Sequence, residues 1–203
     1  MKMLFEPLQM KGMKIRNRTV RSATYEGMGT PVGEPSERLA ELYAELAAGD
    51  IGLIMTSAAL IERYKIPLPE TDGLPYPLFI DNDDVIDRWK PIVDKIHSSG
   101  ASTGMQVVHP GRQDNPVFRG EPPIAPSAVE EKSTGTMPRE MTQEDIDDII
   151  EKFAQACRRA KEAGFDAVQL HGAHAYLLSQ FLSPYTNRRE DEYGGSLENR
   201  MRF

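Results

Sequence analysis

The segment DAVQLHGAHAY (residues 166–176) joins a short apolar run to a cluster of polar rings. The run Asp166–Leu170 predicts a β-strand, because it is apolar, short and followed by a glycine-containing turn. His171, His174 and Tyr176 come next, so the strand leads directly into two imidazoles and a phenol. Three polar rings gathered at a strand end indicate a ligand site rather than a set of turn residues with satisfied hydrogen bonds.

A zinc site is an alternative interpretation of the two histidines. Their spacing, with Gly172 between them, differs from the i, i+4 helical pair of a zinc protease, and Cys157 is the only thiol in the chain. We therefore expect no metal site. Cys157 falls on the apolar face of a predicted helix, which favours a packing role over a nucleophilic one.

Composition is that of an ordinary globular protein. The chain has 203 residues, of which 39% are hydrophobic and 27% charged, enough to bury a sizeable core. A net charge of −7 argues against nucleic acid and anionic membranes as partners, because both attract basic surfaces. No segment resembles a signal peptide or approaches the ~20 apolar residues of a membrane span. A single cysteine fits a reducing compartment, so we predict a cytoplasmic location.

Apolar strands alternate with amphipathic helices along the chain, a pattern typical of parallel α/β sheets. The first eighteen residues predict a small hairpin, and residues 19–203 predict four strand-helix units. Strands are expected at Thr19–Thr24, Ile51–Leu60, Thr103–His109 and Asp166–Leu170; helices are expected to begin at Ser36, Asp83 and Thr142 and to end near Gly49, Gly100 and Gly164. Pro91 predicts a kink or a split in the second helix. Ile150 and Cys157 are expected on the buried face of the third helix.

Two architectures fit such units, an open doubly wound sheet or part of a (β/α)8 barrel. Gly27-Met28-Gly29 lacks the third glycine of a dinucleotide-binding turn. Polar residues gather at strand ends, as in the active sites of barrels. The connection over residues 110–141 contains six prolines and is long enough to be an active-site loop or lid.

Several blocks of sequence resemble one enzyme family in order and spacing. They are Asn17-Arg18-Thr19-Val20, Gly52-Leu53-Ile54-Met55, Gln106-Val107-Val108-His109-Pro110-Gly111-Arg112, Ala125-Pro126-Ser127-Ala128, His171-Gly172-Ala173-His174-Ala175-Tyr176, Phe181-Leu182-Ser183-Pro184 and Asn187-Arg188-Arg189. Together they are similar to the N-terminal part of the Old Yellow Enzyme family, the NADH:flavin oxidoreductases and ene-reductases, with the 2,4-dienoyl-CoA reductases as close relatives. The resemblance implies an FMN-dependent TIM barrel.

The resemblance also implies a reaction and roles for the three rings. Family members take hydride from NADH or NADPH onto FMN and reduce an alkene conjugated to a carbonyl group, so an enone-like small molecule is the expected substrate. His171 and His174 would bind the substrate and donate to its carbonyl oxygen, where negative charge grows. Tyr176 would deliver the proton, because a phenol is acid enough to protonate a carbanion-like carbon at neutral pH. A hydrogen-bonded core tyrosine is the alternative for Tyr176.

Cofactor contacts carry over from the same resemblance. The expected FMN-binding residues are Ala23, Thr24, Tyr25, Ala58, Gln106 and His171. Gln106 would pair with the pyrimidine edge, because an amide both donates and accepts. Tyr25 departs from the family, which often has a cysteine or threonine there.

The remaining departure concerns length. A full barrel takes roughly 250 residues, and about its first four units are expected in this chain. The loops that hold the FMN phosphate and the cysteines of an iron–sulfur cluster are not expected among these units. We therefore expect self-association or pairing with a complementary C-terminal half. A half barrel that binds flavin weakly without turnover is one alternative. A non-flavin aldolase or isomerase is another, but it requires a strand-end lysine, and the candidate strands contain no lysine.

Overall fold

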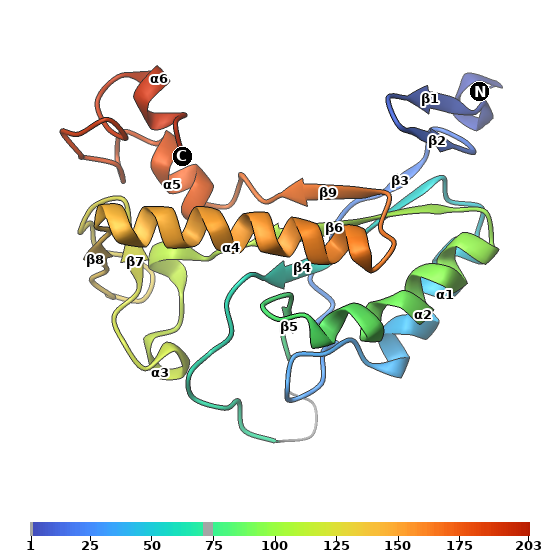
Figure 1. Ribbon diagram of the computed structural model, residues 1–203, viewed down its shortest axis with the longest axis horizontal. Helices are drawn as coiled ribbons and strands as arrows, with labels where there is room; N and C mark the ends of the chain where they lie inside the picture. The colour runs from blue at the N-terminus through green and yellow to red at the C-terminus, as the bar shows by residue number, and fades with distance from the viewer. Residues whose placement is uncertain (1, 71–74) are drawn as a thin grey trace.

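The computed structural model describes residues 2–70 and 75–203 (Figure 1). Met1, which falls in the predicted hairpin segment, lies outside the described residues. Residues 71–74, which fall in the predicted barrel units, also lie outside them. The chain begins with a short 3-10 helix, η1 (Lys2–Phe5), and an antiparallel hairpin of β1 (Leu8–Met10) and β2 (Met13–Ile15). The hairpin predicted from the first eighteen residues is therefore present.

The central sheet is parallel and decides between the two predicted architectures. Its strands β3 (Val20–Arg21), β4 (Leu53–Leu60), β6 (Ser102–Val108) and β9 (Ala167–Leu170) lie side by side in chain order, and the short β5 (Leu78–Phe79) also pairs with β4. A doubly wound sheet reverses its strand order at a switch point, whereas a barrel adds each strand beside the previous one. The observed order is that of a barrel.

The first strand is shorter than predicted. Only Val20 and Arg21 pair with β4, although the expected strand covers Thr19–Thr24. Arg21, the last residue of β3, forms an ion pair with Glu26 at 2.5 Å. The predicted strand is correct in its place along the chain and too long at its carboxyl end.

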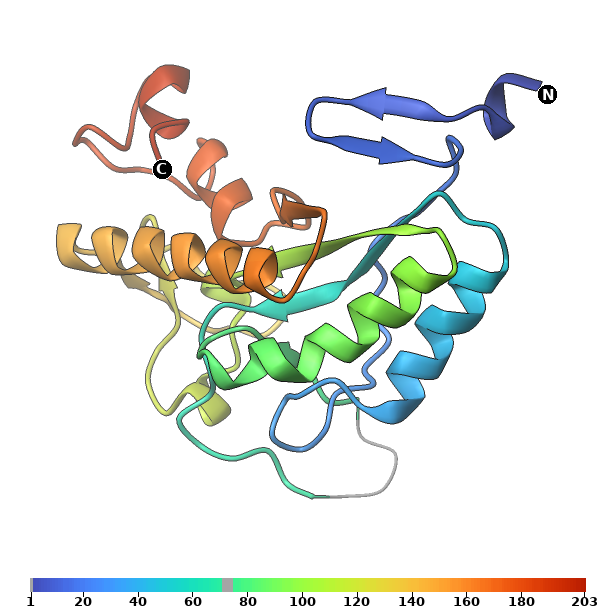
Figure 2. The same cartoon turned by 45° about the vertical axis from the view of Figure 1, so that its right-hand side comes forward.

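Three helices lie along one face of the sheet: α1 (Glu37–Ala48), α2 (Asp84–Ser98) and α4 (Gln143–Glu162) (Figure 2). The predicted starts are confirmed, since the Ser36 hydroxyl accepts from Leu39 N–H and Thr142 forms a reciprocal capping box with Asp145. Gly49 ends α1 as predicted. Such caps satisfy backbone groups that an isolated helix end leaves unpaired.

Two helix predictions differ from the structure in detail. Of the kink or split predicted at Pro91, the split is absent, because α2 runs unbroken through this residue. Pro91 and Asp87, whose carbonyl loses its helical donor, both face solvent, where water can replace the missing bond. In α4, Ile150 is 42% exposed and Cys157 only half-buried, because the apolar stripe is narrower than the sequence suggested and centres on Ile146, Ile149 and Phe153.

The main core lies between these helices and the sheet. Its largest fully buried side chains include Trp89 and Tyr43, and the Trp89 ring meets Phe165 edge-on with ring centroids 5.4 Å apart. Such large aromatic contacts fix the helices against the strands. Within residues 2–70 and 75–203, no helix has the length and apolar character needed to cross a membrane.

The long connection after β6 is ordered. It contains η2 (Gly111–Gln113), α3 (Pro116–Arg119) and a parallel pair of short strands, β7 (Ile124–Ala125) and β8 (Arg139–Glu140). The chain after β9 continues into α5 (Leu177–Leu182) and α6 (Leu197–Arg200). This arrangement brings η2 into contact with α5, in the segment that follows β9.

Candidate active site

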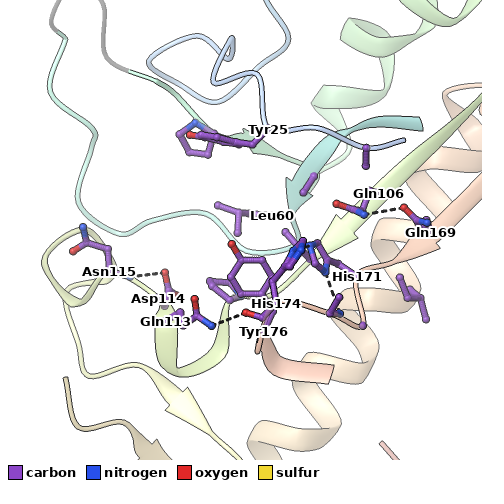
Figure 3. Close-up of a pocket in the computed structure, with 18 of the residues that line it drawn as sticks. Tyr25, Leu60, Gln106, Gln113, Asp114, Asn115, Gln169, His171, His174 and Tyr176 are labelled. Atoms are coloured by element: carbon purple, nitrogen blue, oxygen red, sulfur yellow. Dashed lines mark hydrogen bonds between the residues drawn. The ribbon is translucent and has the colours of Figure 1, made fainter. Parts of the chain in front are cut away.

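A cavity of about 490 Å³ opens at the carboxyl end of the parallel strands (Figure 3). Seven of the predicted site residues line it: Ala23, Tyr25, Ala58, Gln106, His171, His174 and Tyr176. They come from the ends of β4, β6 and β9 and from the loop after β3. Parallel strands bring their carboxyl ends to one edge, so residues far apart in sequence meet there.

Thr24 is the predicted cofactor residue that the structure does not bring to the cavity lining. Its side chain is exposed, and its hydroxyl donates to the carbonyl of Ser22 over 3.2 Å. Its neighbours Ala23 and Tyr25 both line the cavity, so the chain passes the cavity here and only the Thr24 side chain lies outside the lining.

The rings of His171, His174 and Tyr176 form one cluster on the cavity wall (Figure 3). The centroid of the His171 ring lies 4.9 Å from that of His174 and 4.9 Å from that of Tyr176, and the His174 and Tyr176 centroids are 6.2 Å apart. All three pairs meet edge to face, which is the favoured geometry for aromatic rings. The segment after β9 therefore presents two imidazoles and a phenol to a single space.

Hydrogen bonds assign the imidazole protons. Nδ1 of His171 accepts from the N–H of Ala173 at 3.3 Å, which leaves the proton of the neutral ring on Nε2. That nitrogen lies 3.1 Å from Nδ1 of His174 and donates to it. With Nδ1 accepting this bond, Nε2 is the nitrogen of His174 that carries the donor N–H. The two rings form a directed chain of donors beside the cavity.

Burial lowers the pKa of His171 below its ordinary value, and the neighbouring His174 lowers it further. Both effects oppose a positive charge on the ring, because burial removes water from the imidazolium and a second imidazolium would repel it. His171 is accordingly a neutral hydrogen-bond donor at pH 7.

Gln106 on β6 and Gln169 on β9 are paired at the floor of the cavity. Nε2 of Gln106 donates to Oε1 of Gln169 at 2.8 Å (Figure 3). The bond occupies one amide hydrogen of Gln106 and leaves its carbonyl oxygen and second hydrogen for a ligand. Gln169 was not among the predicted site residues, although its place in the strand just before His171 was a usable signal.

Other lining residues were also missed from the sequence. Tyr64 and Asp114 come from two loops, and burial, followed by the Asp114 charge, raises the pKa of Tyr64 to about 12. Burial likewise raises the pKa of Tyr25, and Tyr176 adds to that shift. These phenols remain protonated at neutral pH, and the hydroxyl of Tyr25 donates to the Pro75 carbonyl at 3.3 Å. No local pattern marks Tyr64, because only the folded loops bring it here.

His109, at the end of β6, faces a second cavity of about 180 Å³. Its Nε2 lies 3.3 Å from the carboxylate of Glu62, which is also 3.1 Å from Arg119 and 2.8 Å from Lys152. Burial alone would raise the pKa of Glu62, but hydrogen bonds from His109 and Lys152 and the charge of Arg119 outweigh it and hold that pKa well below its ordinary value. The Glu62 carboxylate therefore connects side chains from the end of β6, from α3 and from α4.

Replacing Glu62 by glutamine is expected to lower the free energy of unfolding at pH 7 by about 2 kcal/mol, because Lys152 and Arg119 lose a shared counter-charge. A carboxyl group whose pKa is lowered by folding stabilises the protein above the ordinary glutamate pKa of ~4.3, and this contribution is lost as the pH falls toward the folded value. The difference between wild type and Glu62→Gln should therefore shrink in urea unfolding below pH 4.

The matched control is Glu121→Gln, which breaks an exposed ion pair with Lys65. Exposed pairs contribute little to stability, so its unfolding curves should follow those of the wild type at both pH values. Equal effects of the two variants at pH 7 would contradict the role assigned to Glu62.

Within the part of the chain that the structure describes, no three histidine, cysteine, aspartate or glutamate side chains are grouped to hold a metal ion. The two imidazoles of the cavity instead bond to each other.

Comparison with known proteins adds to this geometry. The family described as NADH:flavin oxidoreductase / NADH oxidase matches residues 3–203. The NADH oxidase of Thermoanaerobacter brockii is 41% identical over 201 residues, which cover 98% of this chain and 30% of that enzyme.

Two solved structures share the fold. Morphinone reductase in complex with tetrahydroNAD superposes with a TM-score of 0.85 at 33% identity, covering 98% of this chain and 57% of that one. Old Yellow Enzyme from Pichia sp. AKU4542 superposes with a TM-score of 0.86 at 31% identity, covering 98% and 53%. The chain thus spans about half of each solved relative. This chain belongs to the NADH:flavin oxidoreductase / NADH oxidase family, and its α/β fold matches the TIM barrel of Old Yellow Enzyme over that shared length.

Proposed function

We propose that this chain carries the flavin and substrate site of an FMN-dependent ene-reductase, which takes hydride from NADH or NADPH and reduces the C=C bond of α,β-unsaturated carbonyl compounds. The observation that carries the proposal is the cluster of His171, His174 and Tyr176 on one cavity wall. Membership of a family of NAD(P)H-dependent flavin oxidoreductases supports the cofactor assignment.

The lining of the cavity fits a flat, hydrogen-bonding ring such as that of FMN. Ala23 and Ala58 leave space at the strand ends because their side chains stop at Cβ. Gln106 offers both an acceptor and a donor, as the pyrimidine edge of a flavin requires. Tyr25 lies across the cavity from Tyr176 and adds an aromatic wall (Figure 3). These residues, with His171, would hold the ring, and reduced FMN would supply hydride to the β-carbon of the substrate.

The imidazoles account for substrate binding in this proposal. A carbonyl oxygen that enters the cavity can accept from Nε2–H of His174 and can replace Nδ1 of His174 as the acceptor for His171. Two donors aimed at one oxygen stabilise the negative charge that develops there during alkene reduction. Since His171 stays neutral at pH 7, it meets this oxygen as an uncharged donor through Nε2–H.

Tyr176 is assigned the proton transfer. Its ring contacts both imidazoles from the same wall, so its hydroxyl serves the same substrate that they bind. Delivery of a proton to the α-carbon completes the addition of hydrogen across the double bond. The phenolate that results regains a proton from solvent through the open cavity.

The experiment that tests the function uses the purified protein and FMN. We expect FMN to bind, to bleach anaerobically on addition of NADH or NADPH, and to recover its colour when 2-cyclohexenone is added. Cyclohexanone, which has the carbonyl but no C=C bond, is the matched control and should leave the flavin bleached. Failure of the enone to restore the colour of bound, reduced flavin would contradict the proposal.

A second proposal concerns association through β9. Among the described strands, β9 pairs only with β6, and Leu170 on it is 52% exposed. An open strand edge with an exposed apolar side chain favours pairing with another strand. We propose that a second copy of the chain or a complementary C-terminal half occupies this edge. Native mass spectrometry should detect a dimer, whereas a monomer at all concentrations, or a stable complex only with a different chain, would contradict self-association.

A further inference from the structure

The turn that carries His174 has an unusual backbone. His174 and Ala175 have φ angles of 56° and 55°, so two consecutive residues with side chains occupy the left-handed region. This region is unfavourable for residues other than glycine, and such turns persist only where surrounding groups hold them. The contacts that hold this one therefore decide where the His174 imidazole lies.

Two glutamine amides bind the carbonyl oxygens of this turn. Nε2 of Gln113 donates to the carbonyls of His174 and Ala175 at 2.8 and 2.9 Å. Nε2 of Gln180 donates to the Ala175 carbonyl at 2.5 Å and to that of Pro110 at 3.0 Å. The turn is thus bonded from both sides by side chains that belong to η2 and α5.

The side chain of Gln180 is held in one position by burial and by its hydrogen bonds. Its side chain is fully buried at 0% exposure, and its Oε1 accepts from the N–H of Arg112 at 3.1 Å. Gly111 packs so closely on this amide that a Cβ there would lie 2.2 Å from Oε1. A buried amide with all of these bonds fixes η2 and the turn relative to each other.

We propose that Gln113 and Gln180 are positioning residues that clamp the left-handed turn and so hold the His174 imidazole against His171 at the cavity. The catalytic meaning of this clamp rests on the function proposed above. Its structural part, the placement of one imidazole by two amides, can be tested without any turnover.

The test uses Gln113→Ala, because Gln113 is exposed and its loss leaves the buried Gln180 network intact. The readout is the NMR titration of the histidines in the complete protein. His174 and Tyr176 are the titratable groups that face His171. With the turn released, His174 moves off His171, and the titration of His171 should shift upward toward its ordinary pKa. His97, which binds Asp166 on the surface, is the internal reference.

Ala175→Gly provides the rescue variant. Glycine adopts a positive φ without strain, so the turn then depends less on its amide clamp. We expect the double variant Gln113→Ala/Ala175→Gly to regain the His171 titration of the wild type. Ala175→Gly alone should raise Tm by about 2–4 °C, a shift typical of relieving such strain in a chain of this size.

Gln9→Ala is the matched control, since Gln9 also bonds two carbonyls of a turn, those of Met10 and Met13, far from the cavity. It should leave the His171 titration unchanged. In enone reduction, Gln113→Ala should lower kcat/KM by up to about 10²-fold, as the misplacement of a catalytic group does, while flavin reduction by NADPH stays the same.

The two proposals fail in different ways. An unchanged His171 titration in Gln113→Ala, or a shift that Ala175→Gly does not reverse, overturns the clamp. A protein that shows the shift and its rescue but reduces no enone retains the clamp and loses the proposed function.

Discussion

Replacing Tyr176 by phenylalanine is expected to slow the reduction of an enone by about 10²–10³-fold, the effect usual for loss of a general acid. The ring remains and can keep its edge-to-face contacts with His171 and His174, so only the hydroxyl is removed. Stopped-flow absorbance of the flavin separates the two half-reactions. Reduction of the flavin by NAD(P)H should proceed at the wild-type rate, because that step uses no proton from this phenol.

The control for this variant is Tyr185→Phe. Tyr185 is 47% exposed and does not line the cavity, so both half-reactions should stay at the wild-type rate. An undiminished oxidative half-reaction in Tyr176→Phe would remove Tyr176 from the proton transfer. Equal slowing of both half-reactions would instead indicate damage to the flavin site.

Replacing His174 by alanine is expected to slow enone reduction by about 10²–10³-fold, because the loss of one hydrogen-bond donor to a developing oxyanion slows other enzymes by that factor. The variant removes the imidazole whose Nδ1 accepts from Nε2–H of His171. It also removes the Nε2–H that would donate to the carbonyl oxygen of the substrate. Binding of a phenol, which places an oxygen in the same position, should weaken in a titration of the flavin spectrum. Reduction of the flavin by NAD(P)H should remain near the wild-type rate.

His97→Ala is the matched control, because His97 lies at the end of α2 with Asp166 as its partner, remote from the cavity. It should change neither phenol binding nor either half-reaction. Loss of both half-reactions to the same extent in His174→Ala would contradict the assignment of His174 to the substrate oxygen. The outcome differs from that of Tyr176→Phe, in which phenol binding should be retained.

Helix ends were predictable because their causes are local. Ser36 and Thr142 bind backbone groups within three residues of themselves, and Gly49 ends α1 directly after its last turn. The strand that precedes His171 was equally visible as an apolar run. The resemblance to the Old Yellow Enzyme family also implied that Ala58 and Gln106 would lie beside His171, and all three line the cavity.

Departures from prediction depend on what surrounds each element in the folded chain. The helix α2 continues through Pro91 because this side of the helix faces solvent, where water can replace the missing bond. Ile150 was expected in the core but is exposed, since the neighbours of α4, and not its periodicity, determine the width of the buried stripe.

The sequence by itself determined the alternation of strands and helices, their caps and the polar rings after β9, because short-range sterics, hydrogen bonds and apolar periodicity depend on residues close in the chain. Only the tertiary structure decided the strand order, the partners of Glu62 and the amides that hold His174. Gln113 lies 61 residues from His174, and Lys152 lies 90 from Glu62. Contacts at such separations form only when the whole sheet and its loops have packed.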